Sequence, residues 1–451
     1  MSARTQDILK LVDVTNATQS RRIFWDRDIY EQELTHVFGR CWQFLTHETL
    51  IPKTGDFVVT KMGEDEVIVL RQADGSIKVF LNSCTHRGNK LCHAEGGNTR
   101  GLACSYHGWA FGIDGSLKGV PCEEAYGPEF DRSCHSLHGI ALVESFHGFV
   151  FGCMDSGAPS LRDYLGDMAW YLDTWMDAAG GIEFLGQPSR SVLRTNWKIP
   201  AENFIGDVYH VNWTHASAFK VITDRARAAG FDISKAAPSL GPDAGIMATT
   251  RHGHGLGVLY DVGPSLMAET CPELFEWQGR RIAELTAKYG PERARLFGGQ
   301  WDTTIFPNCS FVMGGVNAFK QWIPRGPDSI EVLTWAFAEK SLPEDLKQRI
   351  ATVSHRMFGT AGLFESDDGD AMEYCAQQNR GRATRETRVD SSMGRGTERE
   401  DPIFPGIVGD YMNELAQRGF YRYYAECMSS DDWETMRRND GSWKSALLGR
   451  R

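Results

Sequence analysis

The spacing of hydrophobic residues changes character twice along the chain. Residues 1 to about 38 predict helix, because "DIYEQELTHVFGR" places apolar side chains at helical spacing. From "GDFVVTKM" onward, short β-branched runs separated by turns predict strands, and "EVIVLRQADGSIKVFLNS" predicts a hairpin around Asp74 and Gly75. Similar runs continue to about residue 154, so this block predicts a small antiparallel β-domain.

A boundary follows at "DSGAPSLRDYLG", where Gly157 and Pro159 interrupt the pattern. Beyond it, helical stretches such as "SLRDYLGDMAWYLDTWMDA" alternate with strand-like runs such as "CSFVMGGVNAFKQW" and "SIEVLTWAFAEK". The predicted fold class is α+β, with the small antiparallel β-domain inserted before a larger domain of antiparallel sheet covered by helices. We expect a helical segment over 1–38 that packs with the larger domain, the β-domain over 39–156, and the larger domain over 157–451.

Composition and charge exclude two classes of function. The chain has 451 residues, which is long for one ordinary core. Its net charge is −11, with 48 Lys and Arg against 59 Asp and Glu, whereas nucleic-acid binding needs a clustered positive surface. The N-terminal sequence lacks the apolar core of a signal peptide, and no uncharged apolar run approaches the ~20 residues of a membrane helix. We therefore expect a cytoplasmic protein that binds neither nucleic acid nor membrane.

One group of cysteines and histidines has the spacing of metal ligands. It consists of Cys84-x-His86, seventeen intervening residues, and Cys104-x-x-His107. Zinc also binds two cysteines and two histidines, but zinc loops usually contribute a pair of like ligands. Here each loop offers one sulfur and one nitrogen. That division favours a two-iron, two-sulfur cluster with both cysteines on one iron and both histidines on the other.

The residues around these ligands fit the same interpretation. Gly88 and Gly108 let the backbone approach the sulfides of a cluster and donate N–H groups to them. Cys92 and His93 lie between the two loops without glycines at the same offset, so we expect them to be packing or surface residues. The remaining eight cysteines are isolated, which is typical of small buried side chains in a reducing compartment.

The two ligand loops resemble the two boxes of a Rieske domain, as Cys84-Thr-His-Arg-Gly and Cys104-x-x-His-Gly. Respiratory Rieske proteins carry a further cysteine in each box, and here those places hold Asn89 and Tyr106. The resemblance is therefore to the oxygenase branch. It implies a Rieske [2Fe-2S] cluster, whose imidazole ligands raise its reduction potential above that of a cluster with four thiolates.

A second set of candidate ligands lies in "NWKIPAENFIGDVYHVNWTH". On a regular helix Asn203, Asp207 and His210 share a face, whereas His215 lies about 140° from His210. Both histidines reach one ion only if the helix distorts or ends between them, for example at a π-bulge. Two histidines and one carboxylate bind ferrous iron and leave positions open for O₂. Two ordinary histidines are the alternative, but the redox cluster upstream favours iron.

The carboxylate is expected from elsewhere in the fold, and "LFESDDGDAMEYCAQQN" is the outstanding acidic run, although it also suits the N-terminal turn of a helix. Together the two stretches resemble the catalytic domain of aromatic-ring-hydroxylating dioxygenase α-subunits, the naphthalene and biphenyl dioxygenase group. The matching patterns are N-W-K…E-N-F-x-G-D-x-Y-H-x-x-W-T-H and E-S-D-D. The resemblance implies that His210, His215 and Asp368 bind a mononuclear Fe(II), with Asp367 and Asp370 as fallback ligands.

The resemblance also implies an activity and an assembly. In that family, electrons pass from NAD(P)H through a reductase and a ferredoxin to the cluster of one subunit, and then to the iron of its neighbour. Both atoms of O₂ add to an aromatic hydrocarbon ring, mono- or polycyclic, as a cis-dihydrodiol. Three large subunits combine with a small β-subunit as α₃β₃. Asp207 matches the family residue that links a cluster histidine, by position His107, to the iron ligand His210. The alternative is that Asp207 only forms a salt bridge along a helix.

Alternatives remain for the substrate and for the class of protein. Arg225 and Arg227, if they approach the pocket, would suit a Rieske-type hydroxylase of an aromatic carboxylate such as salicylate or terephthalate. An electron carrier or metal-stabilised binding protein without oxygenation is the other class, and the iron-ligand set argues against it. Gln300 and Asp302 stand where relatives carry other polar residues. The pocket that the alignment implies is apolar and consists of Phe204, Val208, Val211, Phe219, Phe358 and Phe364, with Asn203 near the iron.

Overall fold

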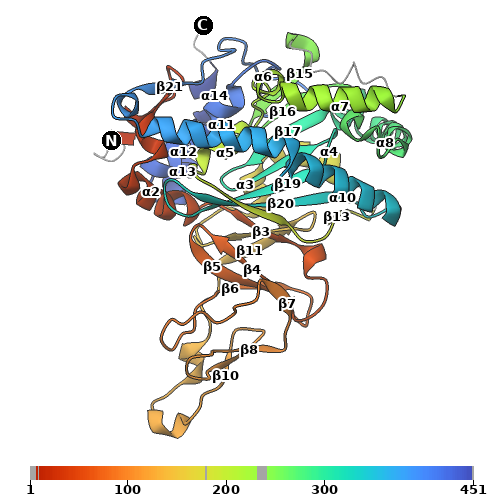
Figure 1. The fold of residues 1–451 in the computed structure, drawn as a ribbon. Helices are drawn as coiled ribbons and strands as arrows, with labels where there is room; N and C mark the ends of the chain where they lie inside the picture. The colour runs from red at the N-terminus through yellow and green to blue at the C-terminus, as the bar shows by residue number, and fades with distance from the viewer. Residues whose placement is uncertain (1–6, 9, 178–179, 231–240, 449–451) are drawn as a thin grey trace. The chain divides into compact units, whose positions relative to one another are not determined.

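The computed structural model describes residues 7–8, 10–177, 180–230 and 241–448. Contacts within the chain separate two compact units (Figure 1). The β unit is Phe38–Leu161, and the α+β unit combines Met1–Val37 with Arg162–Arg451. The predicted α+β fold class is confirmed. No helix in these described ranges is both long and apolar enough to cross a lipid bilayer.

Three small antiparallel sheets make up the β unit, with strand orders β6-β5-β4-β7, β10-β9-β8 and β11-β12-β3. The hairpin predicted around Asp74 and Gly75 is confirmed, because β5 and β6 pair antiparallel on either side of that turn. One core cluster of this unit contains both loop cysteines, Cys84 and Cys104. The strands are β3 (Gln43–His47), β4 (Asp56–Met62), β5 (Asp65–Arg71), β6 (Ile77–Leu81), β7 (Gly96–Asn98), β8 (Gly101–Ala103), β9 (Ala110–Gly112), β10 (Leu117–Gly119), β11 (Leu142–Phe146) and β12 (Phe149–Cys153).

A nine-stranded antiparallel sheet is the centre of the α+β unit, in the order β13-β20-β19-β18-β17-β16-β15-β22, with β14 also paired to β20. Strands β18, β19 and β20 are buried at every position, which explains why their sequences are apolar almost without alternation. The strands are β13 (Ile182–Phe184), β14 (Ser189–Leu193), β15 (Gly245–Thr249), β16 (Gly255–Leu259), β17 (Gln300–Ile305), β18 (Cys309–Met313), β19 (Ala318–Pro324), β20 (Ile330–Glu339) and β22 (Ile407–Asp410).

Helices cover this sheet, as the sequence predicts (Figure 1). Helix α10 packs against β19 and β20, and α12 packs against β15 and β16. The helical stretch predicted after residue 160 is broken, because Gly166 has φ +50° and separates two helices. The helices are α2 (Arg27–Glu33), α3 (Leu161–Leu165), α4 (Asp167–Met176), α5 (Lys198–Asn203), α6 (Val211–Thr214), α7 (Ala216–Ala228), α8 (Glu273–Tyr289), α9 (Pro291–Phe297), α10 (Glu344–Phe358), α11 (Leu363–Asn379), α12 (Leu415–Ser429), α13 (Trp433–Arg438) and α14 (Trp443–Leu447).

The prediction of helix throughout residues 1–38 is wrong in part. Strands β1 (Val12–Asp13) and β2 (Thr18–Ser20) form a hairpin, and β2 pairs with β21 (Arg388–Asp390). Pairing with a distant strand therefore overrides the local tendency of this segment. Helix α2 and the π-helical turn Leu34–Phe38 occupy the stretch where the apolar spacing was most regular.

A buried ion pair joins this N-terminal segment to the rest of the α+β unit. Glu33 in α2 lies 2.5 Å from the Nζ of Lys198 in α5, and neither side chain is exposed to solvent. The same carboxylate accepts hydrogen bonds from Trp197 Nε1 at 2.7 Å and from the Tyr424 hydroxyl at 2.6 Å. Both carboxylate oxygens of Glu33 thus accept hydrogen bonds, which is the condition under which a buried ion pair is tolerated.

We expect Glu33→Ala to lower the free energy of unfolding by about 3–5 kcal/mol, because it leaves the Lys198 ammonium buried without its counter-ion. Glu31→Ala is the matched control, since Glu31 lies on the same helix in an exposed pair with Arg27 at 3.6 Å. That variant should cost less than about 1 kcal/mol. Urea unfolding measures both, and equal losses would contradict a special role for the buried pair.

Two candidate metal centres

The two cysteine–histidine loops of the β unit share one backbone turn. In each loop a glycine amide donates to the cysteine carbonyl four residues earlier, from Gly88 to Cys84 at 2.8 Å and from Gly108 to Cys104 at 2.9 Å. Both glycines have left-handed backbones, with φ of +73° and +74°. Glycine adopts this conformation without the steric cost that a Cβ brings. The matching sequence boxes therefore correspond to matching turns.

The four side chains of these loops suit a two-iron cluster. The rings of His86 and His107 lie with centroids 4.6 Å apart, and Cys84 and Cys104 are both buried. The His86 ring stacks on Trp109 at 4.7 Å, and its Nδ1 atom is buried without a hydrogen-bond partner. A buried ring nitrogen without a partner is unusual in proteins unless it binds a metal or a water. The residues therefore fit the Rieske cluster.

A single zinc ion fits these loops less well. A single zinc ion needs ligand atoms that converge on one point. Within the described ranges, one group of three or more His, Cys, Asp or Glu side chains has ligand atoms within 4.8 Å of one another, and that group is not in these loops. Ligands spread over two irons do not converge in this way. Cys92 is buried in the core that contains the loop cysteines, and His93 is exposed, in line with the packing and surface roles expected of them.

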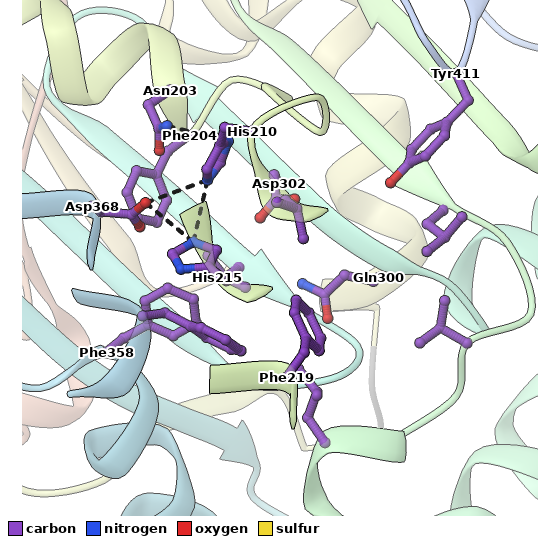
Figure 2. Close-up of a pocket in the computed structure, with 16 residues that line it drawn as sticks. Asn203, Phe204, His210, His215, Phe219, Gln300, Asp302, Phe358, Asp368 and Tyr411 are labelled. Atoms are coloured by element: carbon purple, nitrogen blue, oxygen red, sulfur yellow. Dashed lines mark hydrogen bonds and ion pairs between the residues drawn. The ribbon is translucent and has the colours of Figure 1, made fainter. Parts of the chain in front are cut away.

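The group that does converge is His210, His215 and Asp368 in the α+β unit (Figure 2). The Nε2 atoms of the two histidines are 3.3 Å apart, and Asp368 Oδ1 lies 3.3 Å from one and 3.2 Å from the other. These separations allow one ion to lie about 2.1 Å from all three atoms, bound from one side only. The triangle therefore fits a single iron with open positions on its far side.

Hydrogen-bond acceptors behind the triangle orient both imidazoles. His210 Nδ1 donates to the backbone carbonyl of Asp207 and lies 3.5 Å from its carboxylate, while His215 Nδ1 lies 3.2 Å from Asp367 Oδ2. With the proton on Nδ1, each Nε2 directs its lone pair toward the centre of the triangle.

The two fallback ligands take other positions. Asp367 contacts the far side of the His215 ring and does not join the triangle, and Asp370 is exposed to solvent. Asn203 lies close to the site, with its amide nitrogen 3.4 Å from His210 Nδ1.

The prediction that Asn203, Asp207 and His210 share one helical face is wrong, because helix α5 ends at Asn203. His210 precedes the short helix α6, and His215 lies between α6 and α7, so the chain turns at both histidines without a π-bulge. Gly206 has φ +124°, and a Cβ there would lie 2.6 Å from the backbone nitrogen of Gly257 in β16. The helix ends so that this loop can lie directly on the sheet.

A cavity of about 720 Å³, which includes its open mouth, adjoins the triangle (Figure 2). Five of the six predicted pocket residues line it: Phe204, Val211, Phe219, Phe358 and Phe364. Val208 is the exception, because it is buried and its Cγ1 points toward Gly257 of the sheet.

Sequence reasoning missed several other residues that line this cavity. They come from strands and loops of the sheet, where the register decides which side chains face inward, and no local pattern marks them. Gln300 and Asp302 also line it, whereas Arg225 and Arg227 do not: Arg225 pairs with Glu269 at 2.9 Å, and the Arg227 side chain is 73% exposed. The missed residues are Leu259, Val262, Leu266, Val312 and Tyr411.

A second, larger recess reaches the triangle from another side. It shares Asn203, His210 and Asp368 with the first cavity, and Asp207 and Glu202 also line it. Burial raises the pKa of Glu202 to about 8, and the Tyr421 hydroxyl donates a hydrogen bond to it. The candidate metal site thus lies between an aromatic cavity and a recess rich in carboxyl groups.

The β unit carries two cysteine–histidine loops, and the α+β unit carries a triangle of two histidines and one carboxylate. Together these two sites define the large subunit of a Rieske non-haem iron oxygenase. The family described as "Ring hydroxylating alpha subunit (catalytic domain)" matches residues 161–430, and the family "Rieske [2Fe-2S] domain" matches residues 41–148. The chain therefore belongs to the ring-hydroxylating α-subunits, and it is an oxidoreductase with a Rieske cluster and a mononuclear iron.

Individual relatives are similar along the whole chain. The large oxygenase component of the naphthalene 1,2-dioxygenase system of Pseudomonas aeruginosa is 44% identical over 97% of both chains. That of the 2,4-dinitrotoluene dioxygenase system of Burkholderia sp. (strain RASC) is 40% identical over 97% of this chain and 96% of its own. The solved structure of naphthalene 1,2-dioxygenase with indole bound in the active site has a TM-score of 0.91 at 42% identity, over 97% of this chain and 98% of that chain.

We expect Asp367→Ala to weaken retention of the mononuclear iron about 10–100-fold, because the His215 ring loses the acceptor that orients it. Asp370→Ala is the matched control three residues along the same helix, and its exposed side chain should leave retention unchanged. Dialysis against graded chelator, followed by iron quantitation, measures the effect. Equal retention in the two variants would show that Asp367 does not support the site.

Proposed function

We propose that this chain is the terminal oxygenase subunit that uses O₂ and reducing electrons to cis-dihydroxylate an aromatic hydrocarbon, with a fused-ring arene as its substrate. The observation that carries the proposal is the cavity beside the triangle, which four phenylalanines line. Aromatic and aliphatic walls bind a neutral ring by burial of apolar surface. The naphthalene-oxidising relatives support the same substrate class.

We assign the metal ligands residue by residue. Cys84, His86, Cys104 and His107 would hold the [2Fe-2S] cluster, which when bound supplies electrons one at a time. His210, His215 and Asp368 would hold the ferrous iron, which when bound supplies the site of O₂ activation. The protein itself contributes orientation of the ring and exclusion of water. The phenylalanines hold the arene, and Asp207 and Asp367 keep the imidazoles in the tautomer that binds metal.

We further propose the assembly that the family resemblance implies. Electrons come from NAD(P)H through a reductase and a ferredoxin, and three copies of this chain combine with three copies of a small β-subunit in the cytoplasm. Asp207 would accept hydrogen bonds from His210 and from a cluster histidine, by position His107, of a neighbouring copy. The Asp207 side chain is 34% exposed and lines the carboxyl-rich recess beside the triangle, so it is accessible to such a partner. The Rieske domain would extend over 39–156 and the catalytic domain over 157–451.

Two alternatives are less well supported. A hydroxylase of an aromatic carboxylate needs a cation in the pocket, and no Lys or Arg is among the described residues that line it. Arg225 and Arg227 pair with acidic residues away from that cavity. A simple electron carrier would need neither a second metal triangle nor an aromatic cavity beside it.

Incubation of the purified subunit with naphthalene, O₂ and a compatible reductase and ferredoxin tests the function. We expect a product that has gained two oxygen and two hydrogen atoms, identified by mass spectrometry as a dihydrodiol. Asp368→Ala should abolish this product and lose about one iron atom per chain while keeping the visible spectrum of the cluster. Cys104→Ser should lose that spectrum and keep the mononuclear iron. A diol formed by Asp368→Ala would exclude the assigned iron site.

Asp207→Ala tests the proposed link between the centres. We expect it to retain both metals but to lower turnover at least about 10–100-fold, because His210 loses a carboxylate neighbour and the electron path loses its bridging group. Asp224→Ala is the control, as Asp224 lies on the exposed face of α7 with Lys220. Rapid reduction of the cluster without iron-dependent turnover would be the signature of the variant. Normal turnover with both metals bound would refute the bridge.

A further inference from the structure

One part of the cavity wall differs from the rest, because it carries polar side chains away from the metal ligands. Gln300, Asp302 and Tyr411 line the same space as the phenylalanines (Figure 2). None of these three is one of the converging metal ligands. Their presence in a cavity built for apolar rings calls for a ligand group with which they interact.

The sheet places Asp302 in this wall. Gln300 and Asp302 are two residues apart on β17, so both side chains leave the same face of the strand. Asp302 pairs with Gly257 of β16 on one side and with Val312 of β18 on the other. Since Gly257 has no side chain and Val312 has no polar atom, neither neighbour offers a hydrogen-bonding side chain to the carboxyl group.

The Asp302 carboxyl group has unused hydrogen-bonding capacity. Its side chain is partly exposed, and it makes no hydrogen bond with any residue that the structure describes. Burial raises its pKa to about 7; the His210 imidazole lowers it, and the charge of Asp368 raises it. A ligand group that donates a hydrogen bond to this carboxyl group in the cavity therefore gains affinity.

Tyr411 offers a second free polar atom, whereas Gln300 does not. The Tyr411 side chain is buried and its hydroxyl points into the cavity, and this hydroxyl makes no hydrogen bond within the described part of the chain (Figure 2). The Gln300 carbonyl accepts from the Gly315 amide at 2.8 Å, and its amide donates to the Trp301 carbonyl at 3.2 Å. Gln300 is thus held by the backbone, and Asp302 and Tyr411 remain for a ligand.

We propose that Asp302 and Tyr411 form a hydrogen-bonding subsite that selects arenes bearing an O–H or N–H substituent. This inference rests on the proposed function and deepens it by naming the substrate class. The ring lies among the phenylalanines, and its substituent donates to the Asp302 carboxyl oxygen while Tyr411 donates to the substituent. The substituent is thereby fixed, and a different edge of the ring faces the metal triangle.

The same subsite disfavours arene carboxylates. A carboxylate placed there would meet the Asp302 carboxyl group, which repels it when ionised, and no Lys or Arg is among the described residues that line the cavity. Like charges in a site of low polarity repel strongly. The polar wall therefore selects a neutral donor group and not an acid.

A pair of substrates with equal shape tests the subsite, namely 2-naphthol and 2-methylnaphthalene. In the wild-type enzyme we expect kcat/KM for the naphthol to exceed that for the methyl compound. Asp302→Leu, which keeps the branching at Cγ but has no polar side-chain atom, should lower this ratio about 10-fold or more, and Tyr411→Phe should lower it about 3–10-fold. Asp302→Asn keeps hydrogen-bonding capacity and should retain most of the preference.

Val312→Ala is the matched control, since Val312 neighbours Asp302 in the sheet and lines the same wall without a polar atom. It should change both substrates alike and leave the ratio within about 3-fold of the wild type. The visible spectrum and iron content establish that each variant is folded and loaded. If Asp302→Leu fails to fold, the Tyr411→Phe ratio decides.

Equilibrium binding separates failure of the subsite from failure of the proposed function. Quenching of naphthol fluorescence by the metal-loaded protein, with 2-methylnaphthalene as competitor, reports the preference without turnover. The subsite would be overturned if Asp302→Leu and Tyr411→Phe both left the preference for naphthol over 2-methylnaphthalene unchanged, in binding and in turnover. This would hold even if the enzyme formed diols. A binding preference that disappears in those variants would support the subsite. If the wild type nevertheless oxidised neither compound, the proposed function would be refuted and the subsite would stand.

Discussion

Two imidazole nitrogens and one carboxylate oxygen face one another at 3.2–3.3 Å in the interior of the α+β unit. Each histidine carries its proton on the far nitrogen, because the Asp207 carbonyl and the Asp367 carboxylate lie behind the two rings. Three lone pairs therefore converge on one point, and only a cation makes that arrangement favourable. The end of α5 and the close approach of the following loop to the sheet place these three atoms together.

The sheet fixes this geometry through two glycines. Gly206 and Gly257 approach so closely that a Cβ on Gly257 would lie 3.1 Å from the Gly206 Cα atom. The loop between α5 and α6 can therefore rest on β16, and His210 emerges from that loop at a fixed height above the sheet. The third ligand arrives on a separate helix, α11, which places Asp368 against both imidazoles. A rigid scaffold thus holds ligands from segments that are far apart in the sequence.

The sequence predicts this molecule well where the relevant residues are neighbours along the chain. The Rieske boxes were recognisable because Cys84 and His86, like Cys104 and His107, lie within one turn of each other. The third iron ligand depended on family resemblance, because no local rule connects Asp368 with histidines more than 150 residues earlier. Helix was expected to continue from Asn203 to His210, whereas the end of α5 at Asn203 reflects a tertiary contact of the following loop. Tyr411 escaped notice because only the pairing of β22 brings it to the cavity.

The two recesses beside the triangle divide the chemistry between them. The walls of the first cavity are mostly aromatic and aliphatic and therefore suit a neutral ring. The recess lined by Glu202 and Asp207 is richer in carboxyl groups, and among the described residues that line it Phe24 is the one phenylalanine. Substrate and electron donor therefore need not compete for the same approach to the iron. Under the proposed function, a polar residue in the aromatic wall, such as Asp302, would act on the choice and orientation of the substrate, whereas one in the carboxyl-rich recess would act on the supply of electrons.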